Sequence, residues 1–431
     1  RKLRIPGEKK LTGKGVHYCA LCDGPFYKQK TVAVIGGADS AVKEAIYLAS
    51  LAKKVYIIYR KENVHPEPIT LERMKRLKNI ELIKNTNLKE IIGKQLSLGI
   101  NFVNNGELPR NDYVSSTVDR ISGFDGTGIA PIPKDMEELP DFSRRFGGRN
   151  GLITLNPKAP VKLPACSETL SYTGEVSVRE ELNMMVKIYN ELKPLYPDLD
   201  SNLFFTTPSP GTVALFMENK FYPSYESYLE SIAAVLKQEY DIINNSGFLL
   251  QVDCPDLAMG RHTGFKHLTD KEFVTLMETN VQFLNQALSD VDPNKCRVHI
   301  CWGNYAGTHH CDIDFKKIYP QIMKINAKYI SIEASNHRHS HEWSVFEEFQ
   351  FPEDKVLMPG VIDTSSNIVE HPDLVAQRIQ KYANLIGTEH IIASTDCGFA
   401  TTASAASVTG EIAWLKLGAL VEGAKRAENL F

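Results

Sequence analysis

The chain has 431 residues, which is long enough for one large domain or two ordinary ones. Apolar residues make up 43% and charged residues 23%, the composition of a soluble globular protein, and the formal net charge of −3 provides no basic surface for nucleic acid or an anionic membrane. No apolar run reaches the length of a membrane span and no signal peptide is recognisable, so we expect a cytoplasmic protein without nucleic-acid or membrane partners. Eight cysteines in a chain of this size indicate metal and redox chemistry rather than a disulfide scaffold.

The first ninety residues have the pattern of a dinucleotide-binding unit. An apolar strand predicted at 31–35 runs into a glycine turn, an amphipathic helix at 42–51 and a second strand at 55–58. Glycines in such a turn admit a pyrophosphate, and the helix N-terminus donates hydrogen bonds to it. Positive charge at the end of the second strand favours the 2′-phosphate of NADP. The candidate cofactor-binding residues are Gly36, Gly37, Ser40, Arg60 and Lys61.

Cys19 and Cys22 have the dithiol spacing of thiol oxidoreductases. Together with the glycine turn, this motif makes residues 10–60 resemble the NADPH domain of bacterial-type thioredoxin reductases. The resemblance implies a redox role for Cys19 and Cys22 and binding of NADP, which is expected to be weak if 79–85 leaves the nucleotide-binding sheet one strand short. Ala38 stands in place of the third glycine of the family fingerprint. Both halves of the family's FAD domain have no counterpart, so FAD is not expected and the segment is expected to be redox-silent.

From about residue 94 the sequence alternates between short apolar strands and longer amphipathic helices. Strands are predicted at 203–206, 248–253, 298–301, 329–333, 355–359 and 390–394, and helices at 178–192, 225–244 and 270–288. The segment 131–149, rich in Pro, Gly and charge, is predicted to be a surface loop or lid. The predicted fold class is α/β: a (β/α)8 TIM barrel at 94–431, preceded by a partial Rossmann-like segment at 1–93.

Metal-ligand residues stand at the carboxyl ends of three of the predicted strands. His299 and Cys301 are two residues apart and therefore lie on one face of a strand. Glu333 ends another strand and Cys397 follows a third. Catalytic residues of parallel barrels come from this end, and two thiolates with an imidazole suit Zn²⁺. The alternative is a buried cysteine pair with a histidine satisfied by hydrogen bonds.

The segments HICWGN at 299–304, IEASN at 332–336 and STDCGF at 394–399 resemble the zinc-dependent, cobalamin-independent methionine synthase superfamily, including the epoxyalkane:coenzyme M transferases. The resemblance runs from about residue 96 to the last residue. It implies transfer of a methyl or other alkyl group to a small thiol such as homocysteine, through a zinc-bound thiolate, as in 5-methyltetrahydropteroyltriglutamate–homocysteine methyltransferases. Further matching segments lie at 101–110, 118–124, 171–174, 206–211, 251–261 and 359–372.

The resemblance also implies residue roles. Glu333 is a fourth metal ligand that the substrate thiolate displaces, and Asp253 meets the substrate amino group; the alternative for Asp253 is a helix N-cap. Of the histidines at 337, 339 and 341, His339 is a candidate general acid–base group, unless the three form a polar rim. A second metal site at His309, His310 and Cys311 is one interpretation of that segment, and a plain loop is the other. We also expect two residues at the end of a barrel strand, Asn104 and Glu107, to line the pocket.

The methyl donor and the first barrel strand remain open. The family's extra N-terminal barrel has no counterpart here, so a methylated corrinoid protein or a small alkyl donor is as plausible as a folate. The family's first barrel strand is also missing. We predict that the strand pattern at 79–85 fills its place, because the helix pattern at 88–98 would connect it to the next strand, which starts at 101. Two other functions remain open: an NADPH-dependent disulfide oxidoreductase fragment and an inactive fusion.

Overall fold

The computed structural model describes residues 8–59, 64–83, 86–110, 112–146, 149–150, 153–156, 158, 160–400 and 407–431. The chain divides into two compact units, Arg1–Lys94 and Gln95–Phe431. Within the described ranges, no helix combines the length and the apolar character needed to cross a bilayer. The predicted cofactor residues Arg60 and Lys61 lie outside the described residues.

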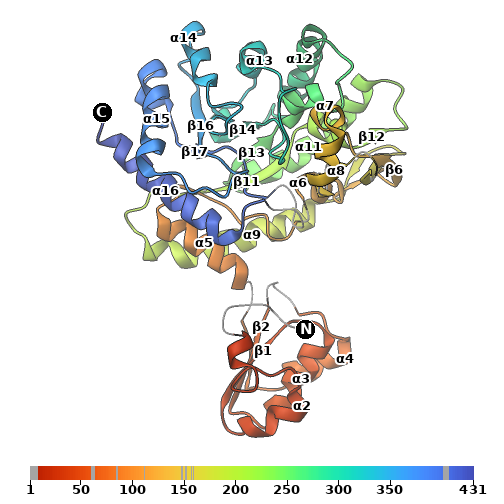
Figure 1. The fold of residues 1–431 in the computed structure, drawn as a ribbon. Coiled ribbons are helices and arrows are strands. Elements are labelled where there is room, and N and C mark those ends of the chain that lie inside the picture. Colours follow the sequence, from red (N-terminus) through yellow and green to blue (C-terminus); the bar gives the residue numbers. More distant parts are fainter. Residues whose placement is uncertain are drawn as a thin grey trace. The chain divides into compact units, whose positions relative to one another are not determined.

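The first unit is built on a three-stranded parallel sheet of β1 (Thr31–Ile35), β2 (Lys54–Ile58) and β3 (Ile80–Ile83), in that order (Figure 1). Helix α3 (Asp39–Ala49) connects the first two strands and α4 (Pro68–Lys75) precedes the third. The strands predicted at 31–35 and 55–58 are confirmed. Val42 and Ala45 of α3 are fully buried against Val55 and Ile57 of β2, because their spacing along the helix puts both on its sheet-facing side. Short helices complete the unit: α1 (Glu8–Leu11), α2 (Ala20–Asp23) and the 3-10 helix η1 (Gly24–Tyr27).

Strand β3 corrects the prediction that 79–85 completes the barrel. It pairs in parallel with β2, with Ile80 opposite Val55. Asn79 fixes this position: its Nδ2 donates to the carbonyl oxygens of Ala49 at 2.8 Å and Ala52 at 3.3 Å, and its own carbonyl accepts from Val55 N at 2.9 Å. The segment is therefore held in the first sheet by polar contacts with residues far away in the sequence, which strand periodicity alone does not reveal.

The second unit contains a curled, seven-stranded parallel sheet with helices on its outer face, which is the architecture of an α/β barrel (Figure 1). The strand order is β17-β16-β15-β14-β13-β11-β4. Its strands are β4 (Phe102–Val103), β11 (Asn202–Pro208), β13 (Leu249–Asp253), β14 (Cys296–Ile300), β15 (Tyr329–Ile332), β16 (Val356–Ile362) and β17 (Ser394–Thr395). Because all seven run in parallel, their carboxyl ends meet at one edge, where Asp253, His299 and Glu333 lie.

Amphipathic helices connect the strands, and the predicted helices at 178–192, 225–244 and 270–288 are confirmed. The longer helices are α5 (Thr86–Leu98), α9 (Glu175–Leu192), α11 (Tyr225–Asn245), α12 (Asp270–Ala287), α13 (Phe315–Ile322), α15 (Pro372–Ile386) and α16 (Gly410–Glu428). Capping boxes start α11 at Ser224 and α12 at Thr269, which explains why these two boundaries are sharp.

Shorter elements lie between the strands and helices of the second unit. They are α6 (Tyr113–Val118), β5 (Ile121–Ser122), β6 (Gly126–Ile129), α7 (Lys134–Glu138), α8 (Pro140–Phe146), β7 (Arg149–Asn150), β8 (Ile153–Thr154), β9 (Lys162–Cys166), β10 (Ser171–Tyr172), η2 (Lys193–Leu195), α10 (Pro210–Phe216), β12 (Glu218–Asn219), η3 (Pro255–Leu257), η4 (Met259–His262), η5 (Pro293–Lys295), η6 (Glu342–Ser344), α14 (Val345–Glu348) and η7 (Thr388–His390).

Two predicted elements differ from the structure. The segment 131–149 is not a loop throughout, because it contains α7 and α8; Pro140 occupies the first position of α8, where its missing N–H costs no hydrogen bond. The strand predicted at 390–394 is mostly replaced by η7 and an isolated bridge between Leu357 and Ile391, and β17 covers only its last residue and Thr395.

Candidate active site

Three donor atoms of the predicted metal site lie together at the carboxyl edge of the barrel sheet. His299 Nε2, Cys301 Sγ and Cys397 Sγ are all within 4.8 Å of one another, and His299 Nε2 is 3.3 Å from Cys397 Sγ. The other ring nitrogen, Nδ1, is 3.2 Å from Ser331 Oγ, which directs Nε2 toward the sulfurs. Burial, followed by the charge of Arg297, lowers the pKa of His299 to about 3, so the imidazole is neutral and able to bind a metal. Two sulfurs and one imidazole in this space fit a zinc ion.

Glu333 lies beside these donors and is held by hydrogen bonds. Its Oε1 accepts from the backbone N–H of Trp302 at 2.8 Å and from Cys397 Sγ at 3.4 Å. Its Oε2 accepts from Asn336 Nδ2 at 2.8 Å. The fourth predicted ligand is therefore next to the three donor atoms, on the side of Cys397.

Asp396 joins the ends of β15 and β17, a role that the sequence did not reveal. Its Oδ1 accepts from the backbone N–H groups of Ala334 and Ser335 at 2.8 and 2.9 Å, and its Oδ2 from that of Asn336 at 2.9 Å. Burial and the neighbouring charge of Glu333 raise the pKa of Asp396 to about 7. Since Asp396 precedes Cys397, these bonds tie one sulfur donor to the strand end that carries Glu333.

Asp253 lies in a polar chain inside the barrel. Gln251 Nε2 donates to Asp253 Oδ1 at 2.6 Å, and Gln251 Oε1 accepts from Arg297 Nη2. An arginine side chain only donates, so the amide of Gln251 has to present its NH2 group to Asp253. Burial and the nearby charge of Glu107 raise the pKa of Asp253 to about 7. Glu107 itself accepts from Arg110 Nη1 at 3.3 Å and from Thr206 Oγ1.

A cavity of about 220 Å³ opens between the loops that follow β14, β15, β16 and β17. Its wall includes Glu333, Asp396, Asp363 and Ser365. Residues 304–309 of the loop after β14 form another side, including His309, which the sequence suggested only as part of a second metal site.

His339 is buried and is not one of the residues that line this cavity. Its Nε2 is 3.0 Å from Asp312 Oδ2 and its Nδ1 is 3.4 Å from Glu342 Oε1. Its ring stacks on Trp302 with a centroid distance of 4.0 Å. The candidate acid–base histidine therefore contacts carboxylates on both sides.

The second predicted cluster divides into two groups. His310 Nε2 lies 2.9 Å from Glu138 Oε2, and Cys311 Sγ is 3.6 Å from the same oxygen, on the protein surface. His309 turns away from them toward Asp312. The sequence does not identify the pair His309 and Asp312 as part of the site, because other residues that the pair contacts come from other loops.

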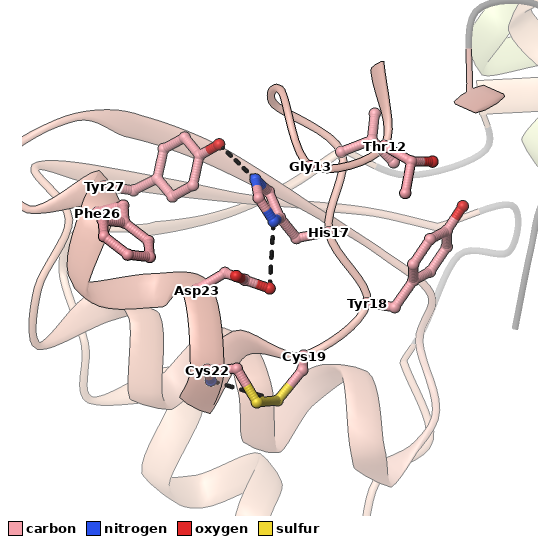
Figure 2. A pocket seen from close by; sticks show the side chains of 10 residues that line it. Thr12, Gly13, His17, Tyr18, Cys19, Cys22, Asp23, Phe26 and Tyr27 are labelled. Carbon is pink, nitrogen blue, oxygen red and sulfur yellow. Dashed lines mark hydrogen bonds and ion pairs between the residues drawn. A yellow bond between two sulfur atoms is a disulfide. The ribbon is translucent and has the colours of Figure 1, made fainter. Parts of the chain in front are cut away.

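The first unit carries a disulfide between Cys19 and Cys22 at the wall of a separate cavity of about 690 Å³ (Figure 2). His17 points into the same space, with Nδ1 3.1 Å from Asp23 Oδ2 and Nε2 2.7 Å from Tyr27 Oη. Neither His17 nor Tyr27 was among the predicted site residues.

Of the predicted cofactor residues, Gly36 and Gly37 follow β1, and Ser40 lies in the first turn of α3. Gly36 has a φ of +135°, a conformation that favours glycine. A β-carbon at Gly37 would come within 2.5 Å of the Tyr59 ring, so this glycine is needed for close packing.

Comparison with known proteins assigns the two parts to different relatives. Residues 221–425 match the family model described as cobalamin-independent synthase, catalytic domain, and residues 1–118 match that of pyridine nucleotide-disulphide oxidoreductases. A thioredoxin reductase of Mycoplasma pneumoniae is 37% identical over 139 residues, covering 32% of this chain and 42% of the relative. One from Helicobacter pylori is 50% identical over 93 residues, covering 22% and 30%. The chain thus spans less than half the length of these curated relatives.

A solved B12-independent methionine synthase from Shewanella sp. W3-18-1 superimposes with a TM-score of 0.60 at 18% identity, covering 80% of this chain and 87% of that one. At this identity the match shows the shared fold. The N-terminal part of the chain resembles thioredoxin reductases, and the C-terminal part resembles the cobalamin-independent methionine synthase superfamily.

Proposed function

We propose that the chain transfers a methyl or other alkyl group to a small thiol such as homocysteine. The observation that carries this proposal is the group His299, Cys301 and Cys397, with three donor atoms within 4.8 Å at the carboxyl edge of a parallel barrel sheet. These residues would hold zinc, with Glu333 as an exchangeable fourth ligand. When bound, zinc lowers the pKa of a coordinated thiol, so that the sulfur is nucleophilic near neutral pH.

The other residues bind and orient the thiol substrate. In this proposal Asp253, held by Gln251, accepts hydrogen bonds from the substrate amino group. Ser331 keeps Nε2 of His299 facing the sulfurs. Trp302 and Asn336 hold Glu333 until the thiol arrives. Because the reaction requires free thiols at Cys301 and Cys397, we place it in the reducing cytoplasm.

A combined metal and activity measurement tests the proposal. Purified chain should contain about one zinc and should methylate homocysteine from 5-methyltetrahydrofolate, its triglutamate or a methylated corrinoid. A Cys301→Ser/Cys397→Ser double variant should lose both zinc and transfer. The matched control is Cys166→Ser, because this buried thiol donates only to the carbonyl of Glu168 at 3.4 Å. Full zinc occupancy in the double variant would refute the assigned ligands.

In place of the redox silence expected from the sequence, we propose a second, independent activity for the first unit: thiol–disulfide exchange at Cys19 and Cys22 without a flavin. The supporting observation is that the disulfide borders an open cavity together with His17 and Asp23 (Figure 2). NADPH alone is expected to leave this pair oxidised, since a hydride needs a flavin to reach it. A yellow protein whose flavin band bleaches on addition of NADPH would contradict that expectation.

A further inference from the structure

Glu138 is the residue of helix α7 on which two side chains of the loop after β14 converge. Its Oε2 lies 2.9 Å from His310 Nε2 and 3.6 Å from Cys311 Sγ. The three donor atoms all lie within 4.8 Å of one another. A carboxylate oxygen only accepts hydrogen bonds, so the protons of the imidazole and of the thiol both point at this one oxygen. A single cation that replaces both protons would therefore meet three ligand atoms.

The spacing of these atoms fits a zinc ion. Zinc bonds of about 2.0–2.3 Å at tetrahedral angles put neighbouring ligand atoms about 3.3–3.6 Å apart. The 3.6 Å between Cys311 Sγ and Glu138 Oε2 lies in this range. The His310 and Glu138 side chains are 43% and 45% exposed, so a small rotation can bring the 2.9 Å between them into the same range. Their exposure also lets an ion enter from solvent and lets water complete its coordination.

The imidazole of His310 is oriented by a partner that belongs to neither Glu138 nor Cys311. Its Nδ1 is 2.7 Å from Thr308 Oγ1, and that hydroxyl donates to Asp135 Oδ2 at 3.4 Å. Since the hydroxyl proton goes to Asp135, its oxygen accepts from Nδ1, and Nε2 is the nitrogen that gives up its proton to a metal. Histidine ligands of metal ions are typically fixed in this way, by a hydrogen bond from the other ring nitrogen.

The surrounding charge indicates which oxygen is available and how tightly a metal binds. Glu138 Oε1 is 3.7 Å from Lys134 Nζ, so Oε2 is the oxygen left for a metal. The ammonium group of Lys134 repels a cation, and a bound metal has to displace the protons of the thiol and the imidazole. We therefore expect weaker binding here than at the buried group of His299, Cys301 and Cys397.

We propose that Glu138, His310 and Cys311 form a second, weaker zinc site, with water as the fourth ligand. A thiolate and an imidazole select a metal such as Zn²⁺ over Mg²⁺ or Ca²⁺. The bound ion joins α7 to a segment 172 residues away in the sequence. Asp135, three residues before Glu138 and on the same side of α7, already accepts from the N–H of His309 at 2.9 Å. The metal thus adds a second connection to the loop whose residues 304–309 line the cavity.

Cobalt(II) tests this site directly, because a cobalt–thiolate bond has a charge-transfer absorption that oxygen and nitrogen ligands lack. The full chain, with the Cys19–Cys22 disulfide intact and one equivalent of zinc bound, is titrated with Co²⁺. Zinc at the first site stays in place, because cobalt binds such ligands less tightly. The band should grow until one cobalt is bound per chain, and it should be absent in Cys311→Ser.

Neighbouring carboxylates on α7 separate a metal ligand from general surface charge. Glu138→Gln and His310→Ala should each weaken cobalt binding by about 10-fold or more, since each removes a ligand. Glu137→Gln is the matched control: this carboxylate accepts from Lys266 Nζ at 2.6 Å instead, and its loss should not change the affinity. Equal weakening in Glu138→Gln and Glu137→Gln would mean that only surface charge attracts the ion, and the site would be refuted.

The Cys301→Ser/Cys397→Ser variant, titrated without zinc, assigns the band to one of the two sites. The band should persist in it, because Cys311 is still present. The inference is wrong if the band never forms in the wild type, if it remains in Cys311→Ser, or if it disappears in the double variant while circular dichroism shows an unchanged fold. Since the readout is metal binding, a chain that binds this cobalt but transfers no alkyl group would contradict only the proposed function.

Discussion

At the level of single residues, Arg297 donates to the amide oxygen of Gln251, and the amide NH2 of Gln251 in turn donates to Asp253. Without that amide, Asp253 loses the hydrogen bond from Gln251 Nε2, which lies 2.6 Å from its Oδ1, and the carboxylate is free to rotate. Gln251→Leu should therefore raise KM for homocysteine by about 10-fold, equivalent to about 1.4 kcal/mol for one hydrogen bond to a charged group, with little change in kcat. Steady-state kinetics with homocysteine measures this effect.

A thiol without an amino group separates positioning from general damage. KM for 3-mercaptopropionate should not change in Gln251→Leu, since Asp253 has no amino group to hold. Gln321→Leu is the matched control, because this buried glutamine donates at 2.8 Å to Glu278, on helices outside the sheet. Equal losses with both thiols in Gln251→Leu would mean that the amide supports the fold rather than the substrate.

At the level of elements, strand β16 has to pass close to Asp396. A β-carbon at Gly360 would come within 2.0 Å of Asp396 Oδ1, the oxygen that accepts from Ala334 and Ser335. Gly360→Ala should displace this carboxylate and with it Cys397, so zinc affinity should fall by at least 10-fold. Competition with a chelator measures the affinity. In Gly410→Ala, affinity should not change, because among the described residues no atom outside its own helix backbone and chain neighbours lies within 4 Å of the added carbon. A Gly360→Ala variant with wild-type affinity would contradict this role of Asp396.

Asp312 connects three elements, η4 and the loops after β14 and β15, and makes their stability depend on pH. The pKa values of His309 and His339 are raised from 6.5 to about 9, so the folded state binds more protons than the unfolded state between these values. This contribution is complete below pH 6.5 and is lost as the pH rises through about 9. The melting temperature should therefore fall over this range, and Asp312→Asn should flatten the decline. If the melting temperature falls with pH equally steeply in the wild type and in Asp312→Asn, the assignment is wrong.

The sequence predicted elements whose signals are local and missed those that depend on distant contacts. Apolar runs such as those of β13 and β14 identify buried strands, and the i, i+2 spacing of His299 and Cys301 predicts their shared face. The position of β3 depends on hydrogen bonds from Asn79 to carbonyl groups 30 and 27 residues away in the sequence. The cationic state of His309 depends on Asp312 and on the carbonyl of Tyr305, and no sequence spacing reveals such partners.

At the level of the whole molecule, the chain divides into two compact units, and the two proposed activities belong to different units. Because the sulfurs of the candidate metal site and the Cys19–Cys22 disulfide belong to different units, a Cys19→Ser/Cys22→Ser variant should keep its zinc and its rate of thiol methylation. Metal analysis and the transfer assay on the full chain test this. Loss of transfer in that variant, with zinc retained, would show that the redox pair takes part in the reaction.

In the proposed reaction, the substrate thiol binds where His299, Cys301 and Cys397 would hold zinc, and it replaces Glu333. X-ray absorption at the zinc edge, recorded with and without homocysteine, tests this most directly. We predict two sulfur neighbours in the resting protein, from Cys301 and Cys397, and three when homocysteine is present, with the loss of one oxygen neighbour. A sulfur count that stays at two in saturating homocysteine would contradict the account.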